Sequence, residues 1–276
     1  MIGTNQVPWQ QFAEAEGKDW KEAFPEALAT CHLAGIGAWE PVLTSAEELG
    51  AVVAAVHGAG LDMPSVYCGA RLHGADADAE VARLAAIGLR LAHHEGQYLV
   101  VNPDPVAWSA PDDKSDRELE TQARSLSRLG EYLAGEGVRL LYHARDGEMR
   151  RDGREFRAML DAVSDEDMGL CLDAHWIYRG AGNRAEVVND YVDRYLDRIE
   201  TVHLRQSRNG VWTQTLGDGD LDWPALARHI VKSGRFPLGV LECAVEPGTE
   251  QTLSHEDAHR ISRELAERWF PEPAYP

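Results

Sequence analysis

Four side chains of the kind that bind divalent cations occur late in the sequence, each within or shortly after a short apolar run. They are two glutamates, an aspartate and a histidine: Glu148, Asp173, His203 and Glu242. Three carboxylates held close together resist joint ionisation unless a cation lies among them. Oxygen ligands with one imidazole suit Mg²⁺ or Mn²⁺, and Zn²⁺ or Co²⁺ also accept them. The residue types therefore predict one divalent metal ion, provided that the fold brings the four together.

Each of these residues also has an ordinary structural interpretation. Asp173 ends the buried-looking run in GLCLDAHWIYRG and could cap the following helix instead of binding a metal. His203 could be a hydrogen-bonded core histidine, and Glu148 a carboxylate on a surface loop. Glu242, between GVL and CAV, is hard to place in a core without a cation or a basic partner. We interpret Asp173, His203 and Glu242 as ligands and keep both interpretations of Glu148.

The elements that must position these residues alternate strictly along the chain. Short apolar runs flanked by Gly, Pro or Asp predict eight buried strands, at 1–6, 37–43, 62–68, 97–103, 138–144, 168–176, 200–206 and 237–245. Longer segments with apolar residues three and four apart predict eight helices, at 20–35, 45–60, 78–96, 117–137, 153–167, 184–198, 221–234 and 254–270. Such alternation requires crossover connections and a parallel sheet.

Eight such units in 276 residues predict an α/β fold, a (β/α)8 TIM barrel that forms a single domain over residues 1–276. No GxGxxG follows the first strand and no GxxxxGK[ST] occurs, which disfavours a nucleotide-binding open sheet. In barrels of this kind the functional residues lie at the carboxyl ends of the strands. Other reactive or aromatic side chains at those ends are Glu40, His143, Arg145, His175, Trp176, Arg205 and, further on, Trp212.

Composition restricts the class of partner. The formal net charge of −19 disfavours a broad nucleic-acid surface. No apolar run approaches the roughly 18 residues of a membrane span, and the first residues lack the pattern of a secretory signal. The four cysteines are scattered without a CxxC motif, as in a reduced, cytoplasmic protein. We expect a cytoplasmic protein that binds a small molecule, with no nucleic-acid or membrane partner; a homo-oligomer is compatible with the sequence.

The segments YHARDGEM, LDAHW, TVHLRQ, GDGDLDW and LECAVEPGT, with IGTNQVPW at the start, resemble the xylose isomerase-like TIM barrels. That superfamily includes proteins described as sugar phosphate isomerases/epimerases and AP endonuclease family 2. The resemblance covers nearly the whole chain and is nearest to the inosose dehydratase and keto-sugar epimerase branch. Its motifs are specific for the superfamily and say little about the substrate.

The resemblance implies a divalent metal held by Glu, Asp, His and Glu from the fifth to the eighth strand. In this sequence the corresponding residues are one on the fifth strand, followed by Asp173, His203 and Glu242. Many relatives end the fifth strand in Glu, and others have His-x-His followed by Glu. Here Arg145 replaces the second histidine, so Glu148 is favoured as the ligand and His143 is the alternative.

The chemistry implied by the resemblance is proton abstraction next to a metal-polarised carbonyl, giving isomerisation, epimerisation or dehydration of a small keto-sugar or polyol. The expected catalytic residues are Glu148 and Glu242, with His175 and His143 as auxiliaries. The expected substrate-binding residues are Arg145, Arg205, Trp176, Glu40 and Trp212. Arg145 suits a substrate carboxylate, phosphate or hydroxyl, whereas Arg205 could also neutralise the acidic mouth.

Other function classes stay open. A keto-glycoside or C-glycoside lyase on the same scaffold is a close relative of the first hypothesis. A non-catalytic sugar-binding barrel would not need a metal-ligand set. An abasic-site endonuclease is disfavoured, because such enzymes carry ligands for three ions whereas the late strands here supply about one set, and because of the net charge of −19.

Overall fold

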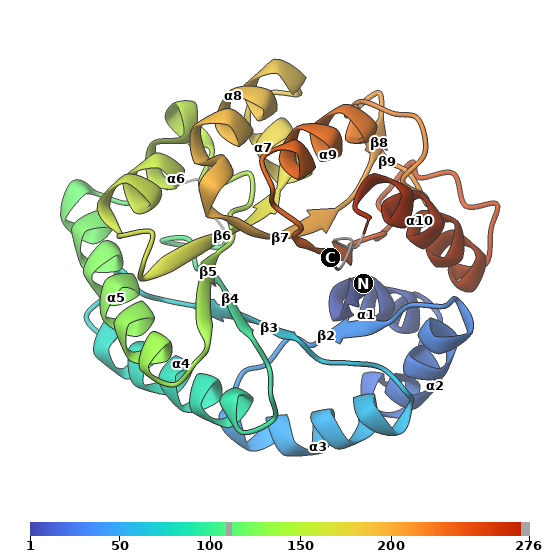
Figure 1. Cartoon of the computed structure of the whole chain (residues 1–276), viewed down its shortest axis with the longest axis horizontal. Coiled ribbons are helices and arrows are strands. Elements are labelled where there is room, and N and C mark those ends of the chain that lie inside the picture. The colour runs from blue at the N-terminus through green and yellow to red at the C-terminus, as the bar shows by residue number, and fades with distance from the viewer. Residues whose placement is uncertain (109–111, 272–276) are drawn as a thin grey trace.

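The computed structural model describes residues 1–108 and 112–271, which form one barrel ringed by helices (Figure 1). Eight parallel strands are hydrogen-bonded in the order β2-β1-β10-β7-β6-β5-β4-β3. Their bounds are β1 Ile2–Asn5, β2 Ala38–Glu40, β3 Ser65–Ala70, β4 Tyr98–Pro103, β5 Arg139–Tyr142, β6 Met168–Asp173, β7 Ile199–Leu204 and β10 Leu238–Leu241. The predicted α/β barrel is confirmed, and the strand that ends at Asp173 is the sixth of the eight.

The sheet closes between β2 and β3 through short bridges instead of a continuous ladder. Ala38 pairs with Asp62 and Val42 with Tyr67, both in parallel. The backbone N–H of Tyr67 donates to the carbonyl of Pro41, at 2.8 Å. Because β2 is only three residues long, the segment that follows it completes the barrel.

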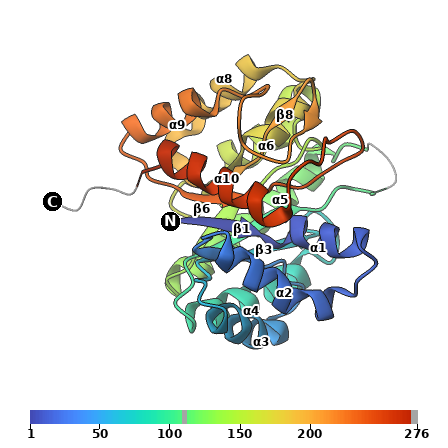
Figure 2. The same cartoon turned by 90° about the vertical axis from the view of Figure 1, so that its right-hand side faces the viewer.

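Ten α-helices occur in the described residues, and most of them form the outer ring (Figures 1 and 2). The eight helices predicted from periodicity are found as α2 Trp20–Leu33, α3 Ala46–Gly58, α4 Ala77–Ala92, α5 Asp116–Gly135, α6 Arg150–Ala162, α8 Ala185–Tyr195, α9 Trp223–Lys232 and α10 His255–Trp269. A short 3-10 turn, Leu196–Arg198, leads from α8 into β7. Their apolar faces cover the barrel and form the main core cluster. None of the described helices is long and apolar enough to cross a membrane.

Two helices were not expected. α1 (Gln6–Ala15) follows β1 directly, where Asn5 Oδ1 accepts from Val7 N–H at 2.8 Å. α7 (Ala174–Gly180) follows β6 directly. The expected strand 168–176 therefore stops at Asp173, and His175 and Trp176 lie in the first turn of a helix. The side chain of Asp173 accepts from the N–H of Trp176, and this cap ends the strand.

A small hairpin, β8 (Ser207–Arg208) with β9 (Val211–Trp212), projects beyond β7. Its turn is Asn209-Gly210, and both residues have positive φ, at 54° and 78°. Asn-Gly is a strong signal for a two-residue hairpin turn. The hairpin thereby brings Trp212 back over the carboxyl end of the barrel.

The barrel interior holds a small apolar cluster formed by Tyr67, Val100, Leu141 and Cys171. The four cysteines are all free and buried, in agreement with reduced thiols that pack as small apolar groups. Trp39 is also fully buried, with Trp20 stacked at 6.5 Å and Phe24 beside it. It is a core residue of the layer between barrel and helices and presents no face to a ligand.

Candidate metal centre and active site

Three side chains converge at the carboxyl ends of neighbouring strands. His143 follows β5, Asp173 ends β6 and His203 lies in β7. One ligand atom of each lies within 4.8 Å of the others, and all three residues are buried. His143 Nε2 is 3.7 Å from Asp173 Oδ2. This spacing leaves room for one cation among two imidazoles and a carboxylate.

The two carboxylate oxygens of Asp173 have different surroundings. Its Oδ1 accepts from the backbone N–H of Trp176 at 2.8 Å, which is the helix cap. Its Oδ2 is buried without a hydrogen-bond partner and faces His143. A buried carboxylate oxygen without a partner is costly unless a cation or donor meets it. The cap fixes the carboxylate, and the second oxygen is available as a ligand.

His143 is oriented by the neighbouring strand. Its Nδ1 is 2.8 Å from Asn102 Oδ1, at the end of β4, so this nitrogen carries the proton. Nε2 then has its lone pair directed at the group and no hydrogen-bond partner. Burial lowers the pKa of His143, although Asp173 opposes that shift. Neutral imidazole with a free Nε2 is the form that binds metals.

His203 lies between two carboxylates. Its Nε2 is 2.9 Å from Glu40 Oε1 and its Nδ1 is 3.4 Å from Glu242 Oε1. Glu40 is itself held by Asn5 Nδ2 at 2.8 Å and by Ser65 Oγ at 2.7 Å. Burial works against the charged imidazole, but the acidic groups Cys171, Glu40 and Glu242 together raise the pKa of His203 well above its usual value. The surroundings therefore favour a positive charge at this point, whether a proton or a metal ion.

Glu40 was expected to touch substrate, but its position differs from that of the other mouth residues. It comes from β2, is 1% exposed, and has a partner for each carboxylate oxygen. Burial opposes its ionisation, yet His203, Ser65 and Asn5 lower the pKa of Glu40. Its contacts suit the orientation of His203, as carboxylates orient many metal-binding histidines.

Glu242 lies beside the group, just after β10. Its Oε2 forms a short ion pair with the guanidinium of Arg205, and Arg205 Nε donates to the Glu242 carbonyl at 3.0 Å. Burial opposes ionisation, but Arg205 and His203 lower the pKa of Glu242 strongly. Glu242 is therefore an ionised carboxylate fixed at the edge of the group, and one side of it faces His203.

Glu148 is not one of the three residues of this group. Its Oε2 accepts from the backbone N–H of Arg145 at 2.7 Å, which ties together the loop between β5 and α6. Burial raises the pKa of Glu148 to about 7, and Glu155 on α6 adds to the shift. His143, the alternative ligand predicted from the fifth strand, lies beside Asp173. β5 ends at Tyr142, so His143 is the first residue after the strand and Glu148 follows five residues later.

Aromatic rings and arginines surround the mouth. The Arg205 guanidinium lies 3.8 Å from the ring centroid of Trp212 and 5.2 Å from that of Trp176. Arg179 forms a bidentate ion pair with Glu246, at 2.7 and 3.0 Å. Glu246 Oε1 also accepts from the Trp212 N–H at 2.9 Å. These contacts fix the two tryptophans beside Glu242 as an apolar wall.

His175 is buried beside Trp212, with the two ring centroids 6.2 Å apart. Burial lowers the pKa of His175 to about 4 against the effect of Asp173, and neither ring nitrogen has a hydrogen-bond partner. On the opposite side, Arg145 donates to the Tyr67 hydroxyl at 3.3 Å and lies 5.8 Å from the Trp108 ring. The structure therefore places both residues near the group without giving either a direct contact to it.

Asn5 and Ser65, which hold Glu40, were missed by the sequence analysis, since each is an ordinary polar residue in an apolar strand. Asn102, which holds His143, is recognisable in the sequence as a polar residue at the end of the fourth strand. The signal that was available is their position: β1 and β4 carry Asn5 and Asn102 near their carboxyl ends. Arg179 and Glu246 are distant in sequence and pair only through the fold.

The fold and this group define a class: a (β/α)8 barrel with a buried His-Asp-His cluster at the carboxyl ends of its strands. The pattern described as Xylose isomerase-like TIM barrel matches residues 28–269. The chain belongs to that family.

Relatives with assigned names are distant. The chain is 26% identical over 237 residues to the rhizopine catabolism protein MocC of Rhizobium meliloti, which covers 74% of this chain and 70% of that protein. It is 23% identical over 180 residues to an inosose dehydratase of Bacillus velezensis, covering 58% of this chain. In that second match the chain spans 59% of the length of the dehydratase.

Solved structures share the fold over almost the whole chain. D-psicose 3-epimerase with D-tagatose, from Clostridium cellulolyticum H10, has a TM-score of 0.73 at 13% identity and covers 99% of each chain. A xylose isomerase-like TIM barrel protein of Mycobacterium smegmatis in complex with magnesium has a TM-score of 0.69 at 11% identity, covering 90% of this chain and 88% of that one. At such identities the likeness concerns the fold.

Proposed function

We propose that this protein is a divalent-metal-dependent isomerase, epimerase or dehydratase of a small keto-sugar or polyol. The observation that carries the proposal is the buried cluster of His143, Asp173 and His203, whose ligand atoms lie within 4.8 Å of one another. His143 Nε2 and Asp173 Oδ2 have no hydrogen-bond partner. Inosose dehydratases among the relatives and sugar 3-epimerases among the structural neighbours support the substrate class.

We assign the metal to His143 Nε2, Asp173 Oδ2 and His203, with the carboxylate of Glu242 as the adjacent fourth group. His143 replaces Glu148 in the ligand set. Two imidazoles with carboxylates are a less oxygen-rich set than the four residues predicted from sequence, and they favour Mn²⁺, Co²⁺ or Zn²⁺ over Mg²⁺. Glu40 keeps the ring of His203 in place through Nε2, which leaves Nδ1 for the ion.

When bound, such an ion would polarise a carbonyl and acidify the adjacent C–H bond. Glu242 is the base in this proposal: it is ionised, and Arg205 fixes its orientation. His175, neutral and with both ring nitrogens unpartnered, is the second group for proton transfer or for binding a substrate hydroxyl. Trp176 and Trp212 present rings to a sugar face, and Arg145 binds a substrate oxygen on the opposite side.

The test is solvent-deuterium incorporation into a panel of inososes and ketohexoses, read by mass spectrometry. The Mn²⁺-loaded protein should label at least one substrate, with loss of water if it is a dehydratase and without it if it is an epimerase. Glu242→Gln should label at least a hundredfold more slowly while retaining metal. Glu250→Gln, a change of an exposed carboxylate, is the matched control. Equal labelling by Glu242→Gln and wild type would exclude Glu242 as the base.

A further inference from the structure

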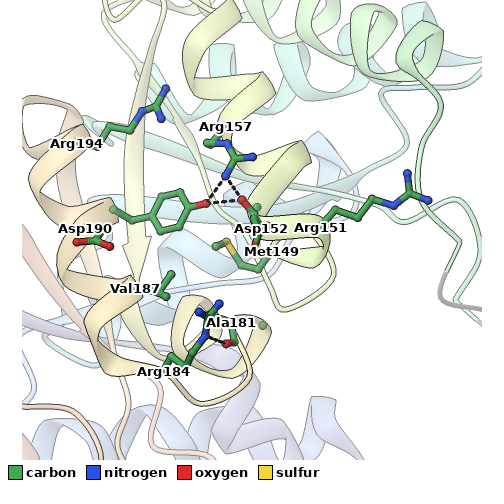
Figure 3. A pocket seen from close by; sticks show the side chains of 12 residues that line it. Met149, Arg151, Asp152, Arg157, Ala181, Arg184, Val187, Asp190 and Arg194 are labelled. Carbon is green, nitrogen blue, oxygen red and sulfur yellow. Dashed lines mark hydrogen bonds between the residues drawn. The ribbon is translucent and has the colours of Figure 1, made fainter.

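A pocket lies between α6 and the α7–α8 segment, and none of the residues that line it belongs to the group of His143, Asp173 and His203. Its volume is about 580 Å³, within the range of small-molecule sites. Figure 3 shows its lining residues, with Arg157 on one side and Arg184 on the other. The lining includes four arginines and two aspartates, Arg151, Arg157, Arg184, Arg194, Asp152 and Asp190. Four arginines around one cavity are unexpected in a chain of net charge −19.

The four arginines differ in their partners. Arg151 pairs with Asp113 and Arg194 with Asp161, each at 2.7 Å, so their charges are compensated. Arg184 Nε donates only to the Ala181 carbonyl, at 2.8 Å. Arg157 donates to the Asp152 carbonyl and to the Tyr191 hydroxyl. Within the described part of the chain, Arg157 and Arg184 thus have only neutral hydrogen-bond partners, and their two guanidiniums line the cavity together with the side chains of Asp152 and Asp190.

The backbone beside the pocket is strained in a way that packing maintains. Arg151, Asp152 and Gly153 have successive φ values of 52°, 55° and 69° inside α6. Left-handed conformations at residues other than glycine cost free energy and tend to occur at functional sites. The Asp152 carbonyl is held in this conformation by Arg157 and by Tyr191 Oη at 2.7 Å. A Cβ on Gly153 would lie 2.3 Å from that hydroxyl, so only glycine permits the arrangement.

The remaining wall is apolar. Met149, Ala181 and Val187 lie between Arg157 and Arg184 in Figure 3, and Tyr191 also lines the pocket. A planar guanidinium binds phosphate or carboxylate through parallel hydrogen bonds, and two of them suit the several oxygens of a phosphate. The cavity is larger than a phosphate group requires, so the apolar wall is left for the body of the ligand.

We propose that this pocket binds a phosphomonoester, with the phosphate between Arg157 and Arg184 and the organic part against Met149 and Val187. It is distinct from the metal cluster. α7, which begins after Asp173, ends at the pocket, and its seven residues span about 10 Å. The ligand would therefore contact the far end of the helix that Asp173 caps.

Calorimetric titration of the full chain with inorganic phosphate, glucose 6-phosphate and glucose tests this proposal. Glucose 6-phosphate should bind saturably and more tightly than inorganic phosphate, and glucose should not bind. Arg184→Gln should weaken the binding at least tenfold, as should Val187→Glu, which adds a carboxylate and removes no arginine. Arg228→Gln removes the same charge from an exposed position on α9 and should bind as wild type does.

Asp173→Asn separates this site from the metal cluster and should leave phosphate binding unchanged. If Asp173→Asn abolishes the binding while Arg184→Gln retains it, the phosphate lies at the metal and the proposal is wrong. Absence of saturable binding by both phosphates, or equal affinities for Arg184→Gln and Arg228→Gln, would also overturn it. None of these outcomes depends on the catalytic activity proposed above.

Discussion

The two carboxylate oxygens of Asp173 have different surroundings in the structure. Oδ1 caps α7 and Oδ2 faces the histidines. An asparagine would keep the capping oxygen and lose the charge. The substitution Asp173→Asn therefore separates the proposed metal binding from the capping of α7.

We expect Asp173→Asn to lower the affinity for Mn²⁺ at least tenfold while the fold persists. Metal analysis of protein purified without chelator measures the loss of bound metal, and circular dichroism measures whether the fold persists. Asp222→Asn is the matched control, because Asp222 caps α9 through the N–H of Ala225 and lies outside the cluster. Equal metal content in the two variants would contradict the assignment of Asp173.

His259 gives a prediction about pH. It is fully buried, its Nδ1 donates to the His255 carbonyl at 2.8 Å, and its ring lies 4.3 Å from that of Trp9. Burial lowers the pKa of His259 to about 4. The unfolded chain takes up the proton near its ordinary pKa of about 6.5, whereas the folded chain does not. The stability due to neutral His259 is complete above pH 6.5 and is lost as the pH falls toward 4, to a maximum of about 3 kcal/mol.

Urea unfolding at pH 7 and pH 4.5 measures this effect. The free energy of unfolding should fall less in His259→Leu than in wild type, because leucine does not titrate. His94→Leu, at an exposed position, should follow wild type at both pH values. A pH dependence of His259→Leu identical to that of wild type would show that His259 is not the titrating group.

At the scale of elements, the junction of β6 and α7 decides the geometry of the site. The apolar pattern through Leu172 predicts a strand, but it does not show where the strand stops. The cap formed by Asp173 turns the chain at once, so Asp173 stays in the cluster while His175 and Trp176 move behind it into the first turn of α7. Such a turn depends on a side-chain hydrogen bond, and the pattern of apolar residues gives no information about that bond.

Helix packing gives a paired prediction on two helical glycines. A Cβ on Gly130, in α5, would lie 2.2 Å from the Asp167 carbonyl oxygen, whereas nothing lies within 4 Å of a Cβ on Gly50, in α3. Gly130→Ala should therefore lower the free energy of unfolding by about 1–3 kcal/mol through overpacking. Gly50→Ala should raise it by about 0.5–1 kcal/mol, because alanine loses less backbone entropy in a helix. Urea unfolding of both variants measures the difference, and two effects of the same sign would contradict the packing of α5.

At the scale of the whole molecule, the contacts around the group of His143, Asp173 and His203 join distant parts of the barrel. Glu40 from β2 contacts His203 from β7, although two strands lie between them in the sheet order. Asn5 from β1 and Ser65 from β3 fix Glu40 on either side. An ion held by this cluster would therefore stabilise the barrel as a unit.

Thermal unfolding measures that stabilisation and also identifies the fifth-strand ligand. Mn²⁺ at a hundred times its dissociation constant should add about 2.7 kcal/mol, which raises the Tm by on the order of 5–10 °C in a chain of this size. EDTA should reverse the rise. Glu148→Gln should show the same rise as wild type, whereas His143→Gln should lose most of it. A rise that survives His143→Gln and disappears in Glu148→Gln would restore Glu148 as the ligand.

The sequence alone determined the barrel, because alternating apolar runs and amphipathic segments are local patterns, and eight of them in one chain leave few topologies. It also placed Asp173, His203 and Glu242 at the mouth, since each follows or lies in a recognisable strand. Parallel strands align their carboxyl ends, so no tertiary detail was needed for that inference.

Only the tertiary structure shows that His143 lies with Asp173 and His203 in one buried group. Glu148 and His143 are five residues apart after β5, and the pattern of the strand does not say which of them meets that group. The same holds for Glu40, whose role depends on Asn5, Ser65 and His203 from three other strands. The physical reason is that side-chain direction and contacts across the barrel depend on loop geometry and packing, which a one-dimensional pattern of residue types does not specify.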